Sequence, residues 1–217
     1  MDLSFGQQVT RDAENLLSSG KDANQVSNIL CKKDAKGYNY GIGIILDGQG
    51  QPLASSPTLL KYATAELSAS QSGAYANSVA LMENLTEAVM EWQRIPQNFR
   101  GMFSLAVPSD AGTGAVLSAV QMALLLDPSL NELGVEELGW PAYRAIAKVC
   151  RVGFKEFPAQ TGGNGKHMLS LYQAGPMNTT GRIPSSETMF TRAKLAAKEG
   201  KPVVLDRAYS GFEYARL

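Results

Sequence analysis

The stretch SSETMFTRAKLAAKEGKPVVLDRAYSGF, residues 185–212, contains the two kinds of element that decide the fold. Residues 186–199 have the composition of a helix, and the apolar run that ends at Leu205 is typical of a buried strand. Asp206 follows this strand directly, and Tyr209 comes three residues later. Ligands of a parallel sheet lie beyond the carboxyl ends of its strands, so the residues after the strand are candidates for a site.

The same alternation of helix and strand extends towards the N-terminus from this stretch. Strands are expected over 41–46, 102–107, 152–157 and 167–174, and helices over 58–70, 79–95, 113–126 and 140–150. This order predicts an α/β fold with a mostly parallel sheet flanked by helices. Residues 1–55, rich in Gly, Asn and Ser, are expected to form an N-terminal arm or small-domain segment, and residues 56–217 part of a large domain.

Composition excludes several classes of function. The chain has 20 basic and 20 acidic residues, a balance that argues against a broad nucleic-acid-binding face. Two cysteines and one histidine are too few for a structural zinc site, and no metal is expected. The N-terminus has no signal pattern, and no apolar run approaches the ~18 residues of a membrane helix. We therefore expect a cytoplasmic protein without a membrane or nucleic-acid partner.

Four segments that follow the expected strands carry glycines or polar side chains. Gly112 and Thr113 begin a helix whose first amides can hold an anion, and Trp140 at a loop–helix junction can stack on a flat ligand. Asn178 lies in a turn, and Asp206 ends a strand. Taken singly, each has an ordinary structural explanation: a strand-to-helix turn, a core tryptophan, an Asx turn and a cap.

Together and in this order, the four segments resemble the class I aminotransferases of the aspartate and aromatic type. The signatures of that family are a Gly-Thr-Gly turn, a Trp-Pro pair, an Asn-Pro-Thr-Gly turn and Asp-x-Ala-Tyr-x-Gly-Phe, and the last is matched by residues 206–212. The resemblance runs from about residue 38 to residue 217. It implies the large domain of a fold-type-I pyridoxal-phosphate transferase, as an N-terminal portion that is incomplete at the C-terminus.

The resemblance also implies a role for each matching residue. Asp206 pairs with the pyridinium nitrogen of pyridoxal 5'-phosphate, Tyr209 and Asn178 bind its phenolic oxygen, and Trp140 stacks on its ring. Gly112 and Thr113 bind its phosphate at a helix N-terminus.

Two further residues are implied on the side of the partner and the substrate. Tyr75 reaches the cofactor phosphate of the second subunit, in a homodimer with shared active sites. Gly43 lies near the substrate entrance, where an amino acid and a 2-oxo acid exchange an amino group.

The chain departs from the family pattern at several positions. Ala111 stands where a hydroxyl residue is frequent, Thr179 replaces the proline of the turn, and Met177 replaces a frequent histidine. The Schiff-base lysine of the family follows the Asp-x-Ala-Tyr motif, whereas no lysine follows Asp206 here. No catalytic residue is therefore assigned, and the chain alone is expected to be inactive, as a truncated part of the parent enzyme.

Two other interpretations stay open. One is a non-catalytic module of the same ancestry that binds pyridoxal phosphate or another phosphate. The other is a nucleotide- or phosphate-binding α/β domain that rests on the turn at 112–114 alone, and it leaves Asn178, Asp206 and Tyr209 unexplained. The amino donor is not specified by the sequence.

Overall fold

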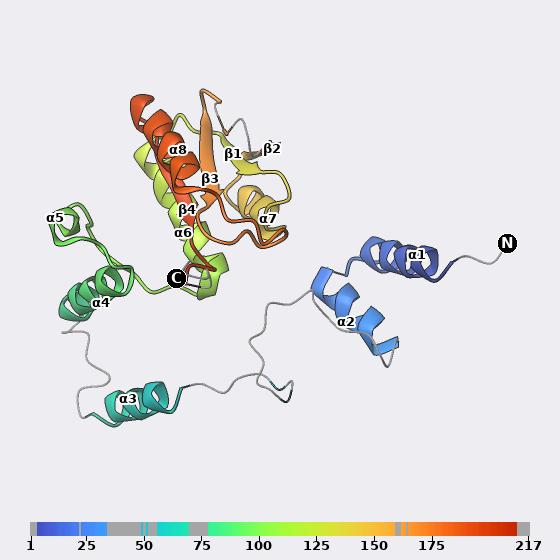
Figure 1. Cartoon of the computed structure of the whole chain (residues 1–217), viewed down its shortest axis with the longest axis horizontal. Helices are drawn as coiled ribbons and strands as arrows, with labels where there is room; N and C mark the ends of the chain where they lie inside the picture. The colour runs from blue at the N-terminus through green and yellow to red at the C-terminus, as the bar shows by residue number, and fades with distance from the viewer. Residues whose placement is uncertain are drawn as a thin grey trace. The chain divides into compact units, whose positions relative to one another are not determined.

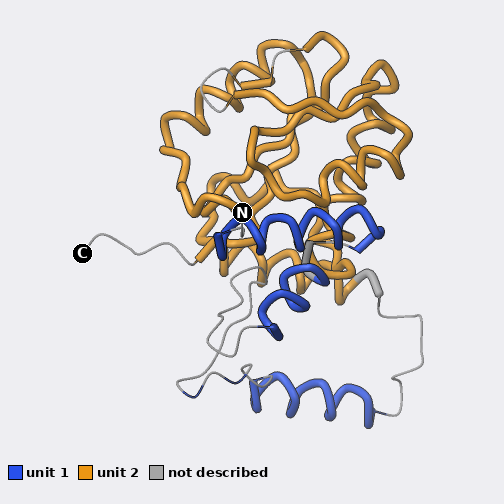
Figure 2. Tube along the Cα trace, turned by 90° about the vertical axis from the view of Figure 1, so that its right-hand side faces the viewer, with its two compact units in different colours: residues 1–75 blue, residues 76–217 orange. Residues whose placement is uncertain are grey.

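The chain forms two compact units, Met1–Tyr75 and Ala76–Leu217, which Figure 2 colours blue and orange. The computed structural model describes residues 4–21, 23–33, 49, 51, 56–69, 78–158, 162–163 and 165–211. The strand expected over 41–46, with Gly43, lies outside these residues, and so does Tyr75. The domain division expected after residue 55 stays a prediction.

The first unit contains the helices α1 (Phe5–Ser18), α2 (Ala23–Lys33) and α3 (Pro57–Ser68). α1 begins with a capping box, in which Ser4 Oγ accepts from the Gln7 amide and the Gln7 side chain accepts from the Ser4 amide. α1 contacts α2, and Lys33 Nζ lies 3.0 Å from Asp12 Oδ2 between them. α1 and α3 bury no residue, so local signals account for these helices better than packing does.

The second unit begins with α4 (Ser78–Trp92) and α5 (Gln97–Arg100) and continues as an α/β layer. Its helices are α6 (Ala111–Leu126), α7 (Ala142–Val149) and α8 (Ser186–Lys198). Its strands are β1 (Glu132–Glu136), β2 (Gly153–Phe157), β3 (Met168–Gln173) and β4 (Val203–Asp206). All strand pairs are parallel, in the order β2-β1-β3-β4, which confirms the expected α/β class (Figure 1).

The hydrophobic core lies between the two central strands and the helices of the layer. β3 is buried along its whole length, and Leu133 and Val135 of β1 are at most 1% exposed. α6 packs against β4, and α7 packs against β1 and β2. From these helices Val120, Tyr143 and Ile146 enter the core. Strands that are buried on both faces are typical of parallel sheets covered by helices.

One expected strand is wrong. Residues 102–107 form no strand, and Met102, Phe103, Leu105 and Val107 are exposed. Ala106 N donates to the Thr86 side chain, 2.8 Å away, instead of to a neighbouring strand. A strand needs a partner for its backbone groups, and the four strands of the described sheet do not include this segment. No helix among the residues described above has the length and hydropathy needed to span a bilayer.

Candidate functional site

The topology of the sheet selects one position on its carboxyl edge. From β1 the chain continues to β2 on one side, and from β3 it continues to β4 on the other. The strand order therefore reverses between β1 and β3, and ligands of open parallel sheets bind at such a switch point. Trp140 follows β1, Asn178 follows β3, and Asp206 is the last residue of β4. All three are residues expected from the sequence.

Asp206, the last residue of β4, is fixed by two hydrogen bonds. Its Oδ2 accepts from the Tyr143 hydroxyl of α7 at 2.7 Å, and its Oδ1 accepts from the Ala208 amide at 2.9 Å. The second bond closes the turn that leads to Tyr209. Asp206 itself is half-buried, so its carboxylate is held in place and still reaches the surface of the edge.

Tyr143 is a residue that the sequence did not reveal as part of the site. Its side chain is 1% exposed, and its ring lies edge-on to Trp140 with centroids 5.5 Å apart. Burial above all, and then the hydrogen bond to Asp206, raise the pKa of its phenol far above the ordinary value. The phenol therefore stays protonated and donates to Asp206. Its acceptor lies 63 residues further along the chain, so no local sequence signal marks it.

Asn178 and Tyr209 meet across the edge. The side-chain Nδ2 of Asn178 donates to the Tyr209 hydroxyl at 2.9 Å. The backbone N–H of Asn178 donates to Oε1 of Gln173, the last residue of β3. Thr179, in place of the family's proline, donates its hydroxyl proton to the carbonyl of Leu138, which follows β1. The turn after β3 is thus attached to both central strands, with the Asn178 side chain on its exposed side.

The approach to Trp140 depends on a glycine. A Cβ on Gly139 would lie 2.9 Å from the Glu136 carbonyl oxygen and 3.4 Å from the Tyr143 ring. Any larger residue would push this turn away from the end of β1. Trp140 is half-buried and packs against the core, as a structural tryptophan does, while the rest of its side chain is free to stack on a flat ligand.

Gly112 and Thr113 lie at the N-terminus of α6 and are exposed. The C-terminus of α6 leads through a short connection to the start of β1, so the N-terminus of α6 lies towards the carboxyl ends of the strands. α6 also packs against β4. A helix N-terminus presents amides without intrahelical partners and a partial positive charge. Ala111, at the first position of α6, has φ +52°, a left-handed conformation that costs about 1–2 kcal/mol for a residue other than glycine.

The family model for aminotransferase class I and II matches residues 48–217. This chain belongs to that family. A comparison with curated proteins gave no match. The cofactor of the family is pyridoxal phosphate, and the expected resemblance to class I aminotransferases is confirmed.

Solved aminotransferases share the fold. The broad specificity aminotransferase from Leishmania mexicana is 20% identical with a TM-score of 0.64, and the match covers 88% of this chain and 51% of that one. The cytoplasmic aspartate aminotransferase from Saccharomyces cerevisiae is 17% identical with a TM-score of 0.62, covering 86% and 49%. An aromatic amino acid aminotransferase with 3-indolepropionic acid is 19% identical with a TM-score of 0.60, covering 79% and 47%. The chain thus spans about half the length of these structures, and its fold is that of the fold-type-I transferases.

Proposed function

We propose that this chain is the cofactor-binding part of an aminotransferase that moves an amino group between an amino acid and a 2-oxo acid. One observation carries the proposal. At the carboxyl edge of the sheet, the carboxylate of Asp206 is held by the buried Tyr143. Asn178, which follows the neighbouring strand β3, is hydrogen-bonded to Tyr209, which follows β4. A fixed carboxylate beside paired amide and hydroxyl groups matches the ring nitrogen and the phenolic oxygen of pyridoxal phosphate.

Asp206 is proposed to bind the protonated pyridine nitrogen. A carboxylate in contact with a cation raises the pKa of that cation and so keeps its proton in place. When bound, the cofactor supplies an electron sink for the bonds of an amino acid's α-carbon. The contribution of this chain is orientation: Tyr143 donates to Oδ2 and the Ala208 amide to Oδ1, so the carboxylate is already in its binding direction.

Asn178 and Tyr209 are proposed to bind the phenolic oxygen, and Trp140 to cover one face of the ring. The amide of Asn178 has a second N–H besides the one given to Tyr209, and a primary amide offers two donors in one plane. The half-buried indole of Trp140 stands on the same edge, edge-on to Tyr143, and an indole face suits a flat aromatic ring.

The phosphate is assigned to Gly112 and Thr113. The N-terminus of α6 combines free amides, a hydroxyl and a favourable dipole, and α6 packs against β4, the strand that ends at Asp206. Tyr75 of a partner subunit and Gly43 remain assigned to the phosphate and the substrate entrance in a homodimer, as the resemblance implies.

These residues hold and orient the cofactor, and none of them is a lysine. No lysine follows Asp206 in the sequence. We therefore assign cofactor binding to this chain. Amino transfer by the parent protein requires a lysine that links to the cofactor, and this chain alone is proposed to be inactive.

The test is equilibrium binding of pyridoxal phosphate to the full chain, followed by the absorbance of the ligand. Asp206→Asn keeps an oxygen that accepts from Tyr143 and removes the charge. A hydrogen bond to a charged group contributes about 1.5–3 kcal/mol, so the variant should bind about 10- to 100-fold more weakly. The control is Glu156→Gln, which removes an exposed carboxylate of β2. Equal affinity of the Asp206→Asn variant and the unmodified chain would refute the proposal.

A further inference from the structure

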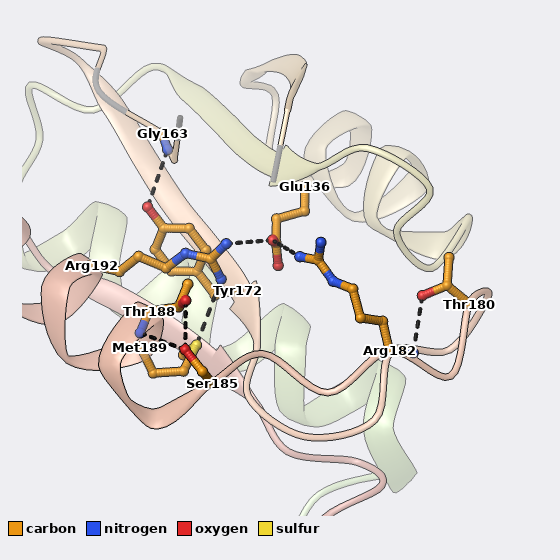
Figure 3. A network of polar contacts seen from close by, with 9 residues as sticks. All are labelled: Glu136, Gly163, Tyr172, Thr180, Arg182, Ser185, Thr188, Met189 and Arg192. Carbon is orange, nitrogen blue, oxygen red and sulfur yellow. Dashed lines mark hydrogen bonds and ion pairs between the residues drawn. The ribbon is translucent and has the colours of Figure 1, made fainter. Parts of the chain in front are cut away.

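Glu136, the last residue of β1, receives two arginines on one oxygen (Figure 3). Arg192 of α8 places its Nη2 2.6 Å from Glu136 Oε1, and Arg182 places its Nη2 3.7 Å from the same atom. Glu136 and Arg192 are 2% and 6% exposed, whereas the Arg182 side chain is 49% exposed. Figure 3 shows the two guanidinium groups approaching the carboxylate from opposite sides.

Arg192 alone accounts for the burial of Glu136. A buried carboxylate requires a close cationic partner, and the 2.6 Å contact supplies one. The guanidinium of Arg192 also lies 4.6 Å from the centroid of the Tyr172 ring, so its own charge is stabilised a second time. Arg182 adds another positive charge to a pair that is already neutral. Glu136 Oε2 has no hydrogen-bond partner among the residues that the structure describes, so Arg182 does not serve the second oxygen either.

The effect of Arg182 falls instead on the turn to which it belongs. Met177 N donates to the Arg182 carbonyl and Gly181 N donates to the Met177 carbonyl, both at 2.9 Å. The Arg182 amide donates to the Thr180 hydroxyl at 3.2 Å. These bonds close residues 177–182 into one unit, and Asn178 is inside it.

This closed turn is attached to the sheet at both ends. Near β3, the backbone N–H of Asn178 is held by the Gln173 side chain. Near β1, the Arg182 side chain is held by Glu136. The hydrogen bond of Thr179 to Leu138 is a third attachment of the same turn. A turn held at these points has little freedom to rotate, and its rotation would move the Asn178 side chain relative to Tyr209.

We infer that Glu136 and Arg182 are positioning residues. Through the turn 177–182, they set the direction of the Asn178 side-chain amide towards Tyr209. Glu136 also forms the buried ion pair with Arg192. The contact of the Arg182 side chain with Glu136 serves to hold the turn. The inference deepens the proposed function and rests on it only where the phenolic oxygen of the cofactor is concerned.

The experiment compares Arg182→Gln, Arg182→Lys and a control, Arg144→Gln. Arg144 is also exposed and also pairs with a glutamate, at 3.5 Å, but it lies on α7 away from the turn. The first readout uses the full chain without ligand: the side-chain amide signals of Asn178 in nitrogen-15 NMR spectra, identified by their loss in Asn178→Ser. The second readout is the affinity for pyridoxal phosphate, together with the pH midpoint at which the absorbance of the bound ligand changes.

Arg182→Gln should shift the signals of the Asn178 side-chain amide and move the pH midpoint. It should weaken ligand binding by up to about fivefold, as expected for the loss of one partly exposed ion pair. Its thermal midpoint should stay near that of the unmodified chain, because Arg182 is half exposed. Arg182→Lys keeps the positive charge, so its signals and its ligand affinity should stay close to those of the unmodified chain. Arg144→Gln should leave every readout unchanged. If Arg182 had a purely structural role, the changes in the Asn178 signals and in ligand affinity would follow the change in the thermal midpoint. The pH midpoint of the bound ligand would then stay the same.

Unchanged Asn178 signals in Arg182→Gln would overturn the inference. Glu136→Gln is the second variant: it should shift the same signals and lower the thermal midpoint as well, because it also breaks the pair with Arg192. If the unmodified chain fails to bind pyridoxal phosphate, the proposed function fails, while the NMR signals of Asn178 still decide whether Glu136 and Arg182 position the turn.

Discussion

The helix α3 of the first unit has 12 residues and buries none of them, whereas α7 of the second unit has eight and buries Tyr143, Ile146 and Ala147. α1 begins with a complete capping box, while the residue before α7, Pro141, makes no side-chain cap. Between α1 and α7, the stronger local signal thus belongs to the helix with less burial. The difference teaches that packing on the sheet, and not helix propensity, places side chains where they can serve a site.

The sharpest way to break this comparison is to remove one leucine from each region. Leu133→Ala, in β1, deletes a side chain that is 0% exposed, and such a deletion costs about 2–5 kcal/mol through lost burial and the cavity left behind. Leu59→Ala, in α3, changes a side chain that is 62% exposed and should alter the free energy of unfolding by less than about 0.5 kcal/mol. Urea unfolding followed by circular dichroism gives both values, and similar losses would contradict the comparison.

The next effect concerns the turn at the end of β1. Gly139→Ala places a Cβ 2.9 Å from the Glu136 carbonyl oxygen, and relieving the overlap should cost about 1–3 kcal/mol. It should also shift the emission of the adjacent Trp140. Gly101→Ala is the matched control, since its Cβ would meet nothing within 4 Å. A Gly139→Ala variant as stable as Gly101→Ala would show that this turn has room to spare.

A smaller effect is expected from the contact between α7 and β4. Tyr143→Phe keeps the buried ring and removes the hydroxyl that donates to Asp206, which should lower stability by about 1 kcal/mol. It should also weaken pyridoxal phosphate binding, because Asp206 loses the group that orients it. Thermal unfolding and ligand titration measure the two quantities separately. Unaltered ligand affinity would remove Tyr143 from the site and leave it in the core.

The smallest effect belongs to the first unit. The hydrogen bond from Lys33 above all lowers the pKa of Asp12 below its ordinary value of 3.8. A lowered pKa in the folded state means that the contact stabilises the pairing of α1 and α2 above that value and is lost as the pH falls through the lowered pKa. A carbon-13 NMR titration of the Asp12 carboxyl should show this pKa. Lys33→Met should raise it towards the ordinary value, while Gln8 and Arg11 still lower it. A titration that is the same in both chains would show that the ion pair is absent in solution.

Much of the sheet layer was predictable because its elements repeat simple patterns. Apolar runs gave β3 and β4, the short segment ending at Phe157 gave β2, and the periodic segments between them gave the helices. β1 was missed because Glu132, Gly134 and Glu136 interrupt its apolar pattern, and Glu136 is buried only through an arginine 56 residues away.

The converse error, at residues 102–107, has the same cause. An apolar run forms a strand only if another strand lies beside it, and the residues of the run do not show whether such a neighbour exists. In the candidate site, Asn178, Asp206 and Tyr209 were found from a motif, whereas Tyr143 was not, because its significance depends on a neighbour that is distant in sequence.

The bond between Tyr143 and Asp206 also has a consequence for the time at which the edge of the sheet is completed. The two residues are 63 positions apart in the chain. At the usual rate of protein synthesis, about 5–20 residues per second, Asp206 is made about 3–13 seconds after Tyr143. An α7 that forms in the microseconds typical of a helix would therefore lack the acceptor of its phenol for seconds. Assembly of the edge thus waits for translation, and not for the folding of its first helix.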